Sequence, residues 1–121
     1  MSPIFVACSG TIPPSFGSLK GLQHHVALHI NELTGTIPSS LGSLTKLDEG
    51  LDLLGNDLTG TLPPALANLD DVKYLYLGSN LLTGTIPSWF GSLSNMENVR
   101  LNDNKLTGTV QCAFSAVAAF L

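Results

Sequence analysis

Charged side chains are scarce in this sequence, which holds five Lys plus Arg and nine Asp plus Glu among 121 residues. The formal net charge is −4 and no basic run occurs, so the chain lacks the cationic surface that binds nucleic-acid phosphates or anionic lipid headgroups. Long apolar runs are missing too, since none approaches the roughly 20 residues that cross a bilayer. We therefore expect no nucleic-acid partner and no membrane span in this chain.

Cysteine is nearly absent, with Cys8 and Cys112 at opposite ends of the chain. Two such distant thiols make no disulfide framework, so cysteine usage does not decide the redox compartment. The opening residues, MSPIFVACSG, lack a basic segment followed by a long apolar segment, and they do not predict a secretion signal. The compartment therefore stays open on these grounds.

What the sequence does contain is a repeat. The phrase Leu-Thr-Gly-Thr recurs four times, and the glycines of the repeat are spaced at intervals of 25, 25, 24 and 24 residues from Gly10 to Gly108. A fixed period of this length is typical of a solenoid, in which each repeat packs on its neighbours. The repeat region, residues 10–109, holds four repeats at 10–34, 35–59, 60–83 and 84–107. We interpret residues 1–9 as the degenerate tail of an earlier repeat, and residues 108–121 as a truncated fifth repeat.

The apolar positions superpose in all four repeats. Each repeat has an Ile-Pro or Leu-Pro step, where the fixed φ of proline suits the start of a short helical turn. An apolar pair two residues apart follows, such as Val26 and Leu28 or Leu75 and Leu77, and it predicts a short strand with one buried face. The first two repeats carry one extra residue before this strand, which a bulge can absorb without turning the apolar face outward.

An asparagine comes three residues after each apolar pair. A buried side-chain amide there can both donate to and accept from backbone groups of adjacent coils, so we interpret the residue as structural. The four positions are Asn31, Asn56, Asn80 and Asn104.

The pattern LxxLxxLxLxxNxLTGxIPxxLGxL, present here in four copies, resembles the plant-specific leucine-rich repeats of receptor-like kinases, receptor-like proteins and polygalacturonase inhibitors. The resemblance implies an α/β solenoid, a right-handed superhelix with a parallel sheet on the concave side and short helical or 3-10 turns on the convex side. It also implies a non-catalytic, receptor-ectodomain-like module that binds proteins or peptides, and an extracellular or cell-surface location. Since no paired-cysteine cap is visible, an uncapped fragment of a longer receptor, able to associate end to end, is an alternative.

The residues that flank the buried strand pairs should face outward on the concave side. Aromatic and charged side chains at such positions are enriched among the residues that dominate binding energy at interfaces. We therefore predict a ligand-binding surface made of Tyr74, Tyr76, Arg100, Asp52, Asn98, Asn102, His25 and His29.

Catalytic and metal chemistry are not indicated. His25 and His29 lie four residues apart, roughly 13 Å along a straight strand, which is too far to share one metal ion. The acid pairs at 48–49 and 70–71 have no apolar pocket that would give the two carboxyls different roles, and no catalytic or nucleotide-binding motif occurs. We expect no enzyme, no metal and no cofactor.

The Thr-x-Thr steps allow a different function. A flat array of methyl and hydroxyl groups, one rung per coil, resembles the ice-binding faces of other β-solenoids, although the same residues also suit ordinary turn chemistry. The alternative ice-binding surface consists of Thr34, Thr36, Thr59, Thr61, Thr83, Thr85, Thr107 and Thr109.

Overall fold

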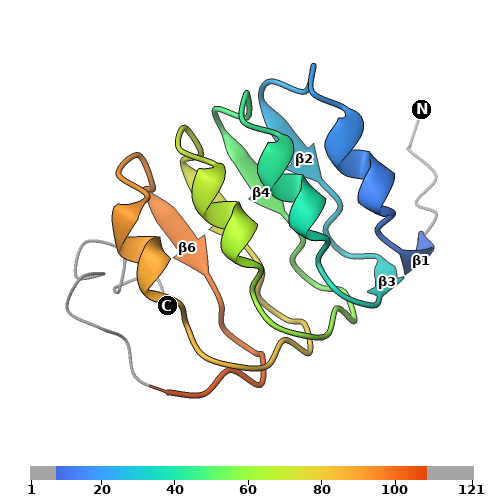
Figure 1. Ribbon diagram of the computed structural model, residues 1–121. Coiled ribbons are helices and arrows are strands. Elements are labelled where there is room, and N and C mark those ends of the chain that lie inside the picture. Colours follow the sequence, from blue (N-terminus) through green and yellow to red (C-terminus); the bar gives the residue numbers. More distant parts are fainter. Residues whose placement is uncertain (1–7, 109–121) are drawn as a thin grey trace, which may run out of the picture.

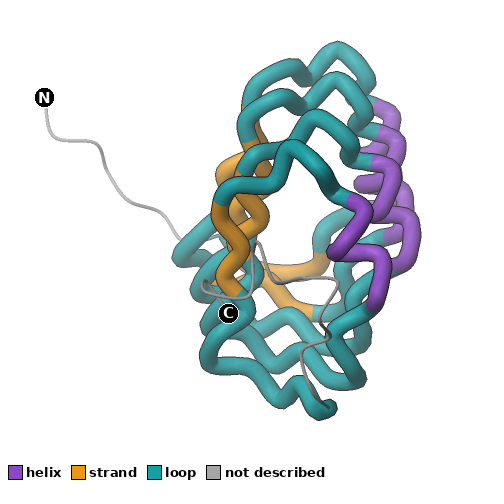
Figure 2. Tube along the Cα trace, turned by 90° about the vertical axis from the view of Figure 1, so that its left-hand side faces the viewer, coloured by secondary structure: helices purple, strands orange, loops and turns teal. Residues whose placement is uncertain are grey.

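The computed structural model describes residues 8–108, which form four coils stacked side by side (Figure 1). Viewed along the stack, each coil is a closed oval with a short 3-10 helix on one side and a strand on the other (Figure 2). In chain order the elements are β1 (Ser9–Thr11), η1 (Pro14–Ser18), β2 (His25–Ala27), β3 (Glu32–Thr34), η2 (Ser39–Ser43), β4 (Gly50–Asp52), η3 (Pro64–Asn68), β5 (Tyr74–Tyr76), η4 (Ser88–Ser92) and β6 (Asn98–Arg100). The predicted solenoid of parallel strands and 3-10 turns is thereby confirmed.

The main sheet has four parallel strands in the order β2-β4-β5-β6. Its register places His25 beside Gly50, Gly50 beside Tyr74, and Tyr74 beside Asn98, so the outward columns expected from the alternation share one face. A second sheet of two parallel strands, β1 and β3, lies on another side of the coil.

The extra residue of the first two coils does not disturb this register. Asp48 N–H donates to the Gln23 carbonyl at 2.8 Å, which pairs the two inserted positions with each other. The His24 carbonyl then accepts from both Glu49 N–H and Gly50 N–H, at 2.9 and 3.2 Å. The two longer coils therefore extend together at the start of their strands, and the apolar faces stay inward.

Each 3-10 helix follows a proline of the Ile-Pro or Leu-Pro step, for example Pro38 with φ −68° and ψ 136°. The turns of the first three coils pack very closely. A Cβ atom added to Gly17 would lie 2.2 Å from the Ser40 carbonyl oxygen, and one added to Gly42 would lie equally close to that of Ala65. In the third coil Ala67 replaces this glycine, and η3 contacts η4 less closely than η2 contacts η3.

The core is a continuous apolar column inside the coils, in which leucines of the second and third coils are almost fully buried. The first coil differs, because Leu19 exposes 50% of its surface, whereas Leu44 at the equivalent position exposes 1%. Within residues 8–108 no earlier helical turn packs against η1, so the outer side of Leu19 stays uncovered.

Candidate functional site

The buried asparagines join neighbouring coils. Asn56 donates from Nδ2 to the carbonyls of Leu28 and Leu53, each at 3.0 Å, and its Oδ1 accepts from Leu33 N–H at 3.1 Å. Asn80 makes the same set of bonds one coil further along. One amide therefore satisfies backbone groups on both sides of a coil boundary, where water does not reach.

The asparagine of the first coil, Asn31, also accepts a hydrogen bond from a backbone N–H group, but from a different residue. Asn31 Oδ1 accepts from Cys8 N–H at 2.8 Å, so Cys8 occupies the place that Leu33 holds in the next coil. Cys8 is exposed and its thiol is free. Its backbone, rather than its sulfur, contributes to the contact.

The threonine ladder is exposed on every coil that the structure describes, and Thr109 lies outside the described residues. Parallel backbone bridges connect the ladder between adjacent coils. Each bridge joins the threonine that follows the repeat glycine of one coil to the threonine that precedes the repeat glycine of the next, as in Thr36 with Thr59. The Thr36 methyl covers Gly60, because a Cβ atom there would lie 2.9 Å from Thr36 Cγ2. The Thr83 hydroxyl donates to the Gly60 carbonyl at 3.4 Å. Some methyl and hydroxyl groups of the ladder therefore contribute to the packing of one coil on the next.

On the main sheet, the side chains of β5 and β6 form one cluster, which we call the tyrosine patch: Tyr74, Tyr76 and Arg100. The two rings stack with their centroids 4.8 Å apart and their planes at 28°. The Arg100 guanidinium carbon lies 5.0 Å from the centre of the Tyr76 ring. This distance places a cation within reach of the ring's negative face, so the three side chains hold one another in position.

Gly50 of the second coil leaves space for the Tyr74 ring. A Cβ atom at Gly50 would lie 2.3 Å from carbons of the Tyr74 ring, so the ring rests directly on the backbone of β4. Burial raises the pKa of Tyr74, and the negative charges of Asp52 and Glu49 raise it further. Tyr74 therefore stays protonated at neutral pH and presents its hydroxyl as a hydrogen-bond donor.

The three histidines of the first coil each face an acid of the second coil. The pairs are His24 Nδ1 with Asp48 Oδ1 at 3.2 Å, His25 Nδ1 with Glu49 Oε2 at 3.3 Å, and His29 Nδ1 with Asp52 Oδ2 at 3.2 Å. Asp52 is half-buried and also accepts from Leu54 N–H at 3.2 Å. It thus lies between a histidine of the first coil and the tyrosines of the third.

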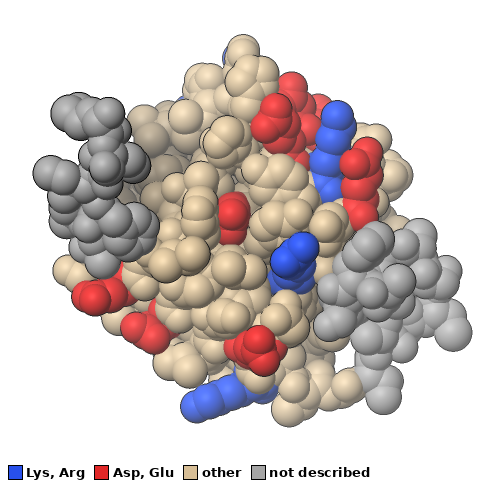
Figure 3. All heavy atoms as spheres, turned by 180° about the vertical axis from the view of Figure 1, so that it is seen from behind, with Lys and Arg blue, Asp and Glu red and all other residues tan. Residues whose placement is uncertain are grey.

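Asn98 and Asn102 flank the outer side of the patch. Asn98 is half-buried beside Tyr74 in the register of the sheet. Asn102 covers Gly78, where a Cβ atom would lie 2.9 Å from its Oδ1, and it donates to Asp103 Oδ2 at 3.0 Å. Seen from the side of the sheet, acidic and basic side chains are scattered and both signs are interspersed with uncharged surface (Figure 3).

The Leucine Rich Repeat family model matches residues 49–69 and 71–93. No curated protein matches the chain. Among solved structures, the BIR2 ectodomain from Arabidopsis thaliana is 38% identical and superposes with a TM-score of 0.82, over 88% of this chain and 55% of that chain. The chain carries leucine-rich repeats of the plant type.

Other plant ectodomains with leucine-rich repeats are similar as well. A chain of the BIR3–SERK2 complex from Arabidopsis thaliana is 34% identical, with a TM-score of 0.82 over 88% of this chain and 56% of that chain. The ectodomain of the receptor kinase GASSHO1/SCHENGEN3 from the same plant, in complex with CASPARIAN STRIP INTEGRITY FACTOR 2, is 29% identical, with a TM-score of 0.84 over 92% of this chain and 13% of that chain. This leucine-rich-repeat protein thus spans little more than half of the shorter ectodomains and a small part of the longer one.

The eight residues predicted for the binding surface fall into three groups. Tyr74, Tyr76, Arg100 and Asp52 come together on the adjacent strands β4, β5 and β6. His25 and His29 pair with acids at the first edge of the sheet, and Asn98 and Asn102 lie at its last edge. The cross-coil contacts of the histidines were missed from the sequence. The signal that could have found them is the repeat alignment, which places His24 opposite Glu49 and His25 opposite Gly50, so each histidine is within one residue of an acid of the next coil.

In the part of the chain that the structure describes, no helix combines the length and the apolar character needed to cross a bilayer.

Proposed function

We propose that this leucine-rich-repeat protein is a non-catalytic module that binds a protein or peptide on the concave face of its main sheet. The observation that carries the proposal is the tyrosine patch, in which two stacked rings and a guanidinium are held on adjacent strands of a rigid solenoid. Tyrosine and arginine offer large contact areas and hydrogen-bonding tips, and little freedom is lost when they are already ordered.

The similar structures support the class of partner. They include a receptor kinase ectodomain in complex with CASPARIAN STRIP INTEGRITY FACTOR 2, the complex of PEPR1 with AtPEP1, and the BIR3–SERK2 complex. By the same similarity we propose an extracellular or cell-surface location for this protein. Acidic and basic side chains are interspersed on this face of the molecule, which suits a partner that is itself mixed in charge (Figure 3).

Asp52, Asn98, Asn102, His25 and His29 extend the proposed surface beyond the patch. Asp52 carries a negative charge within the sheet, and Arg100 carries a positive charge two strands away. A peptide that crosses the strands would meet an acid, two aromatic rings and a base in succession. This order gives the surface a direction, because reversing the peptide would place its charges against like charges.

A selected peptide binder tests the proposal. Peptides selected from a random display library on the purified protein are measured by calorimetry against a triple variant, Tyr74→Ala, Tyr76→Ala and Arg100→Ala. We expect the dissociation constant to rise by about 100-fold or more, because each anchor of this kind contributes about 2 kcal/mol. The circular dichroism spectrum should stay unchanged, since these side chains lie outside the core.

The matched control carries three alanines on the convex side, Ser15→Ala, Ser43→Ala and Asn68→Ala, at exposed positions of η1, η2 and η3. It should bind the selected peptides as the unchanged protein does. Undiminished binding by the tyrosine variant, or equal loss in both variants, would show that the partner is bound elsewhere.

An ice-binding surface on the threonine ladder is the alternative function. Its favourable observation is the exposure of seven regularly spaced threonines, joined by parallel bridges at Thr36 with Thr59 and at Thr85 with Thr107. A thermal-hysteresis assay of the unchanged protein and of Thr59→Tyr separates the two functions. Hysteresis that disappears in the variant would support ice binding, and no hysteresis in either protein would leave the peptide module alone.

A further inference from the structure

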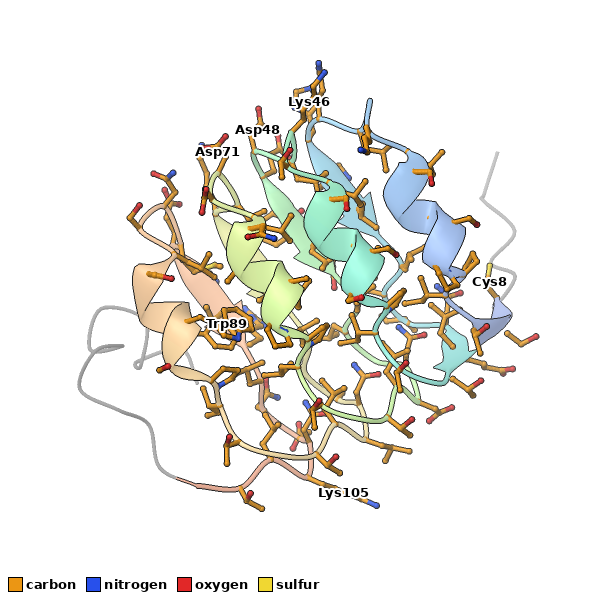
Figure 4. The ribbon with its side chains drawn as sticks, viewed as in Figure 1. Cys8, Lys46, Asp48, Asp71, Trp89 and Lys105 are labelled. Atoms are coloured by element: carbon orange, nitrogen blue, oxygen red, sulfur yellow. The ribbon has the colours of Figure 1, made fainter. Side chains whose placement is uncertain are left out.

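At the start of the first two strands, a nitrogen and two carboxylates converge. His24 offers a ring nitrogen, and Asp48 and Glu49 each offer a carboxylate oxygen, all within 4.8 Å of one another. His24 Nδ1 and Asp48 Oδ1 are 3.2 Å apart. In Figure 4, Asp48 lies at the tip of the loop that precedes β4, away from the core and open to solvent.

We propose that His24, Asp48 and Glu49 bind a divalent transition-metal ion of the Zn²⁺ class. Zinc takes ligands at about 2.0–2.1 Å in a tetrahedron, whose edges are then roughly 3.3–3.4 Å long. The separation between His24 Nδ1 and Asp48 Oδ1 already matches such an edge. The third ligand is the exposed Glu49 carboxylate, which has to rotate toward the other two ligand atoms from a separation of no more than 4.8 Å. Water completes the fourth position.

The donor set selects the kind of ion. One imidazole nitrogen and two carboxylate oxygens suit zinc and neighbouring transition metals, whereas calcium and magnesium are held by six or more oxygens, many of them from water or backbone. The site comes from side chains that the proposed peptide surface does not need, so it is independent of the proposed function.

The backbone holds the two ligand-bearing loops together before any ion arrives. Asp48 N–H donates to the Gln23 carbonyl at 2.8 Å, and Glu49 N–H donates to the His24 carbonyl at 2.9 Å. His25 Nδ1 lies 3.3 Å from Glu49 Oε2 and so limits the directions in which that carboxylate can turn. Ligands from two coils are therefore fixed at the shared extra residue, and little order has to be imposed on binding.

The later coils cannot repeat the arrangement. The third coil has Lys73 at the position that His24 and Glu49 hold in the first two coils. The backbone hydrogen bond from Lys73 N–H to the Glu49 carbonyl, at 2.7 Å, shows this equivalence. An ammonium group repels a metal ion and donates no lone pair while charged. Among the described residues this is the one group of three His, Cys, Asp or Glu side chains with metal-binding separations.

An ion at this site would link the first coil to the second. Because the unfolded chain does not bring the three ligands together, binding stabilises the folded state by mass action. We expect zinc chloride in roughly hundredfold excess over its dissociation constant to raise the melting temperature by several degrees. At the same zinc concentration, His24→Ala and Asp48→Asn should each reduce this rise by about half or more.

The test is calorimetric titration of the untagged 121-residue chain with zinc chloride, in a Cys8→Ser and Cys112→Ser background so that thiols cannot bind the metal. Binding of one ion per chain is expected, with at least a tenfold loss of affinity in His24→Ala and in Asp48→Asn. His29→Ala is the matched control, because His29 pairs with Asp52 at the same 3.2 Å yet belongs to no three-residue group. It should bind zinc unchanged.

Several outcomes would overturn the site: no binding, equal affinity in His24→Ala, equal loss in His29→Ala, or calcium binding as tight as zinc. Circular dichroism of each metal-free variant confirms that it is folded. Because all three ligands are exposed, either substitution leaves the core intact. Peptide binding measured in His24→Ala should be unchanged, so failure of the metal site and failure of the proposed function can be told apart.

Discussion

The first coil and the second coil share the same 25-residue pattern, but equivalent residues are less buried in the first coil than in the second. Leu44 exposes 1% of its surface, whereas Leu19 exposes 50%. Asn56 is buried, whereas Asn31 is only half-buried. The pattern therefore sets the conformation of a coil, and the neighbours on both sides set how much that conformation contributes to stability.

The same comparison holds for backbone conformation. The residue before each asparagine lies in the left-handed region, with φ 53° at Ile30, 72° at Gly55, 53° at Ser79 and 56° at Asp103. Glycine adopts this region without cost, and a β-branched side chain is its least suitable occupant. The first coil thus accepts a strained residue where the second has the favoured one.

The largest expected effect comes from removing a buried ladder amide. Asn80→Ala leaves Leu58 N–H without a partner in a dry interior. The carbonyls of Leu53 and Leu77 each lose one amide donor but keep another, from Asn56 and Asn104. We expect a loss of about 2–4 kcal/mol in the free energy of unfolding, because a buried unsatisfied group costs about 1–3 kcal/mol and each further hydrogen bond contributes about 1 kcal/mol. Urea denaturation followed by circular dichroism measures it.

Asn31→Ala is the control for that loss, because water can replace an amide that is half-exposed. Its expected cost is about 1 kcal/mol. Equal losses at the two positions would contradict the idea that burial by neighbours, rather than the repeat pattern, decides the energy.

A smaller effect is expected at the left-handed position. Ile30→Asn should raise the free energy of unfolding by about 1 kcal/mol, because asparagine tolerates this region and the isoleucine side chain, 55% exposed, contributes little burial. The reverse change in the second coil, Gly55→Ile, should lower it by about 1–2 kcal/mol. The shift of the urea midpoint in each variant checks both, and a less stable Ile30→Asn protein would show that the strain is compensated elsewhere.

Much of this architecture could be predicted from the sequence, because strict periodicity determines which residues share a face. The apolar pair at Leu75 and Leu77 has to face inward, so the residues around it have to face the concave side. The contacts that give the surface its chemistry could not be predicted in the same way. The position of Tyr74 over Gly50 depends on a ring rotamer and on the lateral register, and the His24 cluster joins residues 24 or 25 positions apart.

The smallest expected effect tests the link between the coils through Asp52. This carboxylate pairs with His29 of the first coil and is the largest electrostatic cause, after burial, of the raised pKa of Tyr74 in the third. A nearby negative charge disfavours tyrosinate, so Asp52→Asn should lower the pKa of Tyr74 toward the ordinary value of about 10. Burial remains in the variant and keeps part of the elevation.

The chain has two tyrosines, so a Tyr76→Phe background leaves Tyr74 alone to be followed by the ultraviolet absorbance of tyrosinate. Asp57→Asn is the control, because Asp57 is an exposed acid of the same coil that does not contribute to the shift. If Asp57→Asn lowered the pKa as much as Asp52→Asn, the shift would reflect the net charge of the protein and not a local contact. A fall confined to Asp52→Asn would show that the second coil acts on the tyrosine patch directly, through an acid that His29 of the first coil contacts.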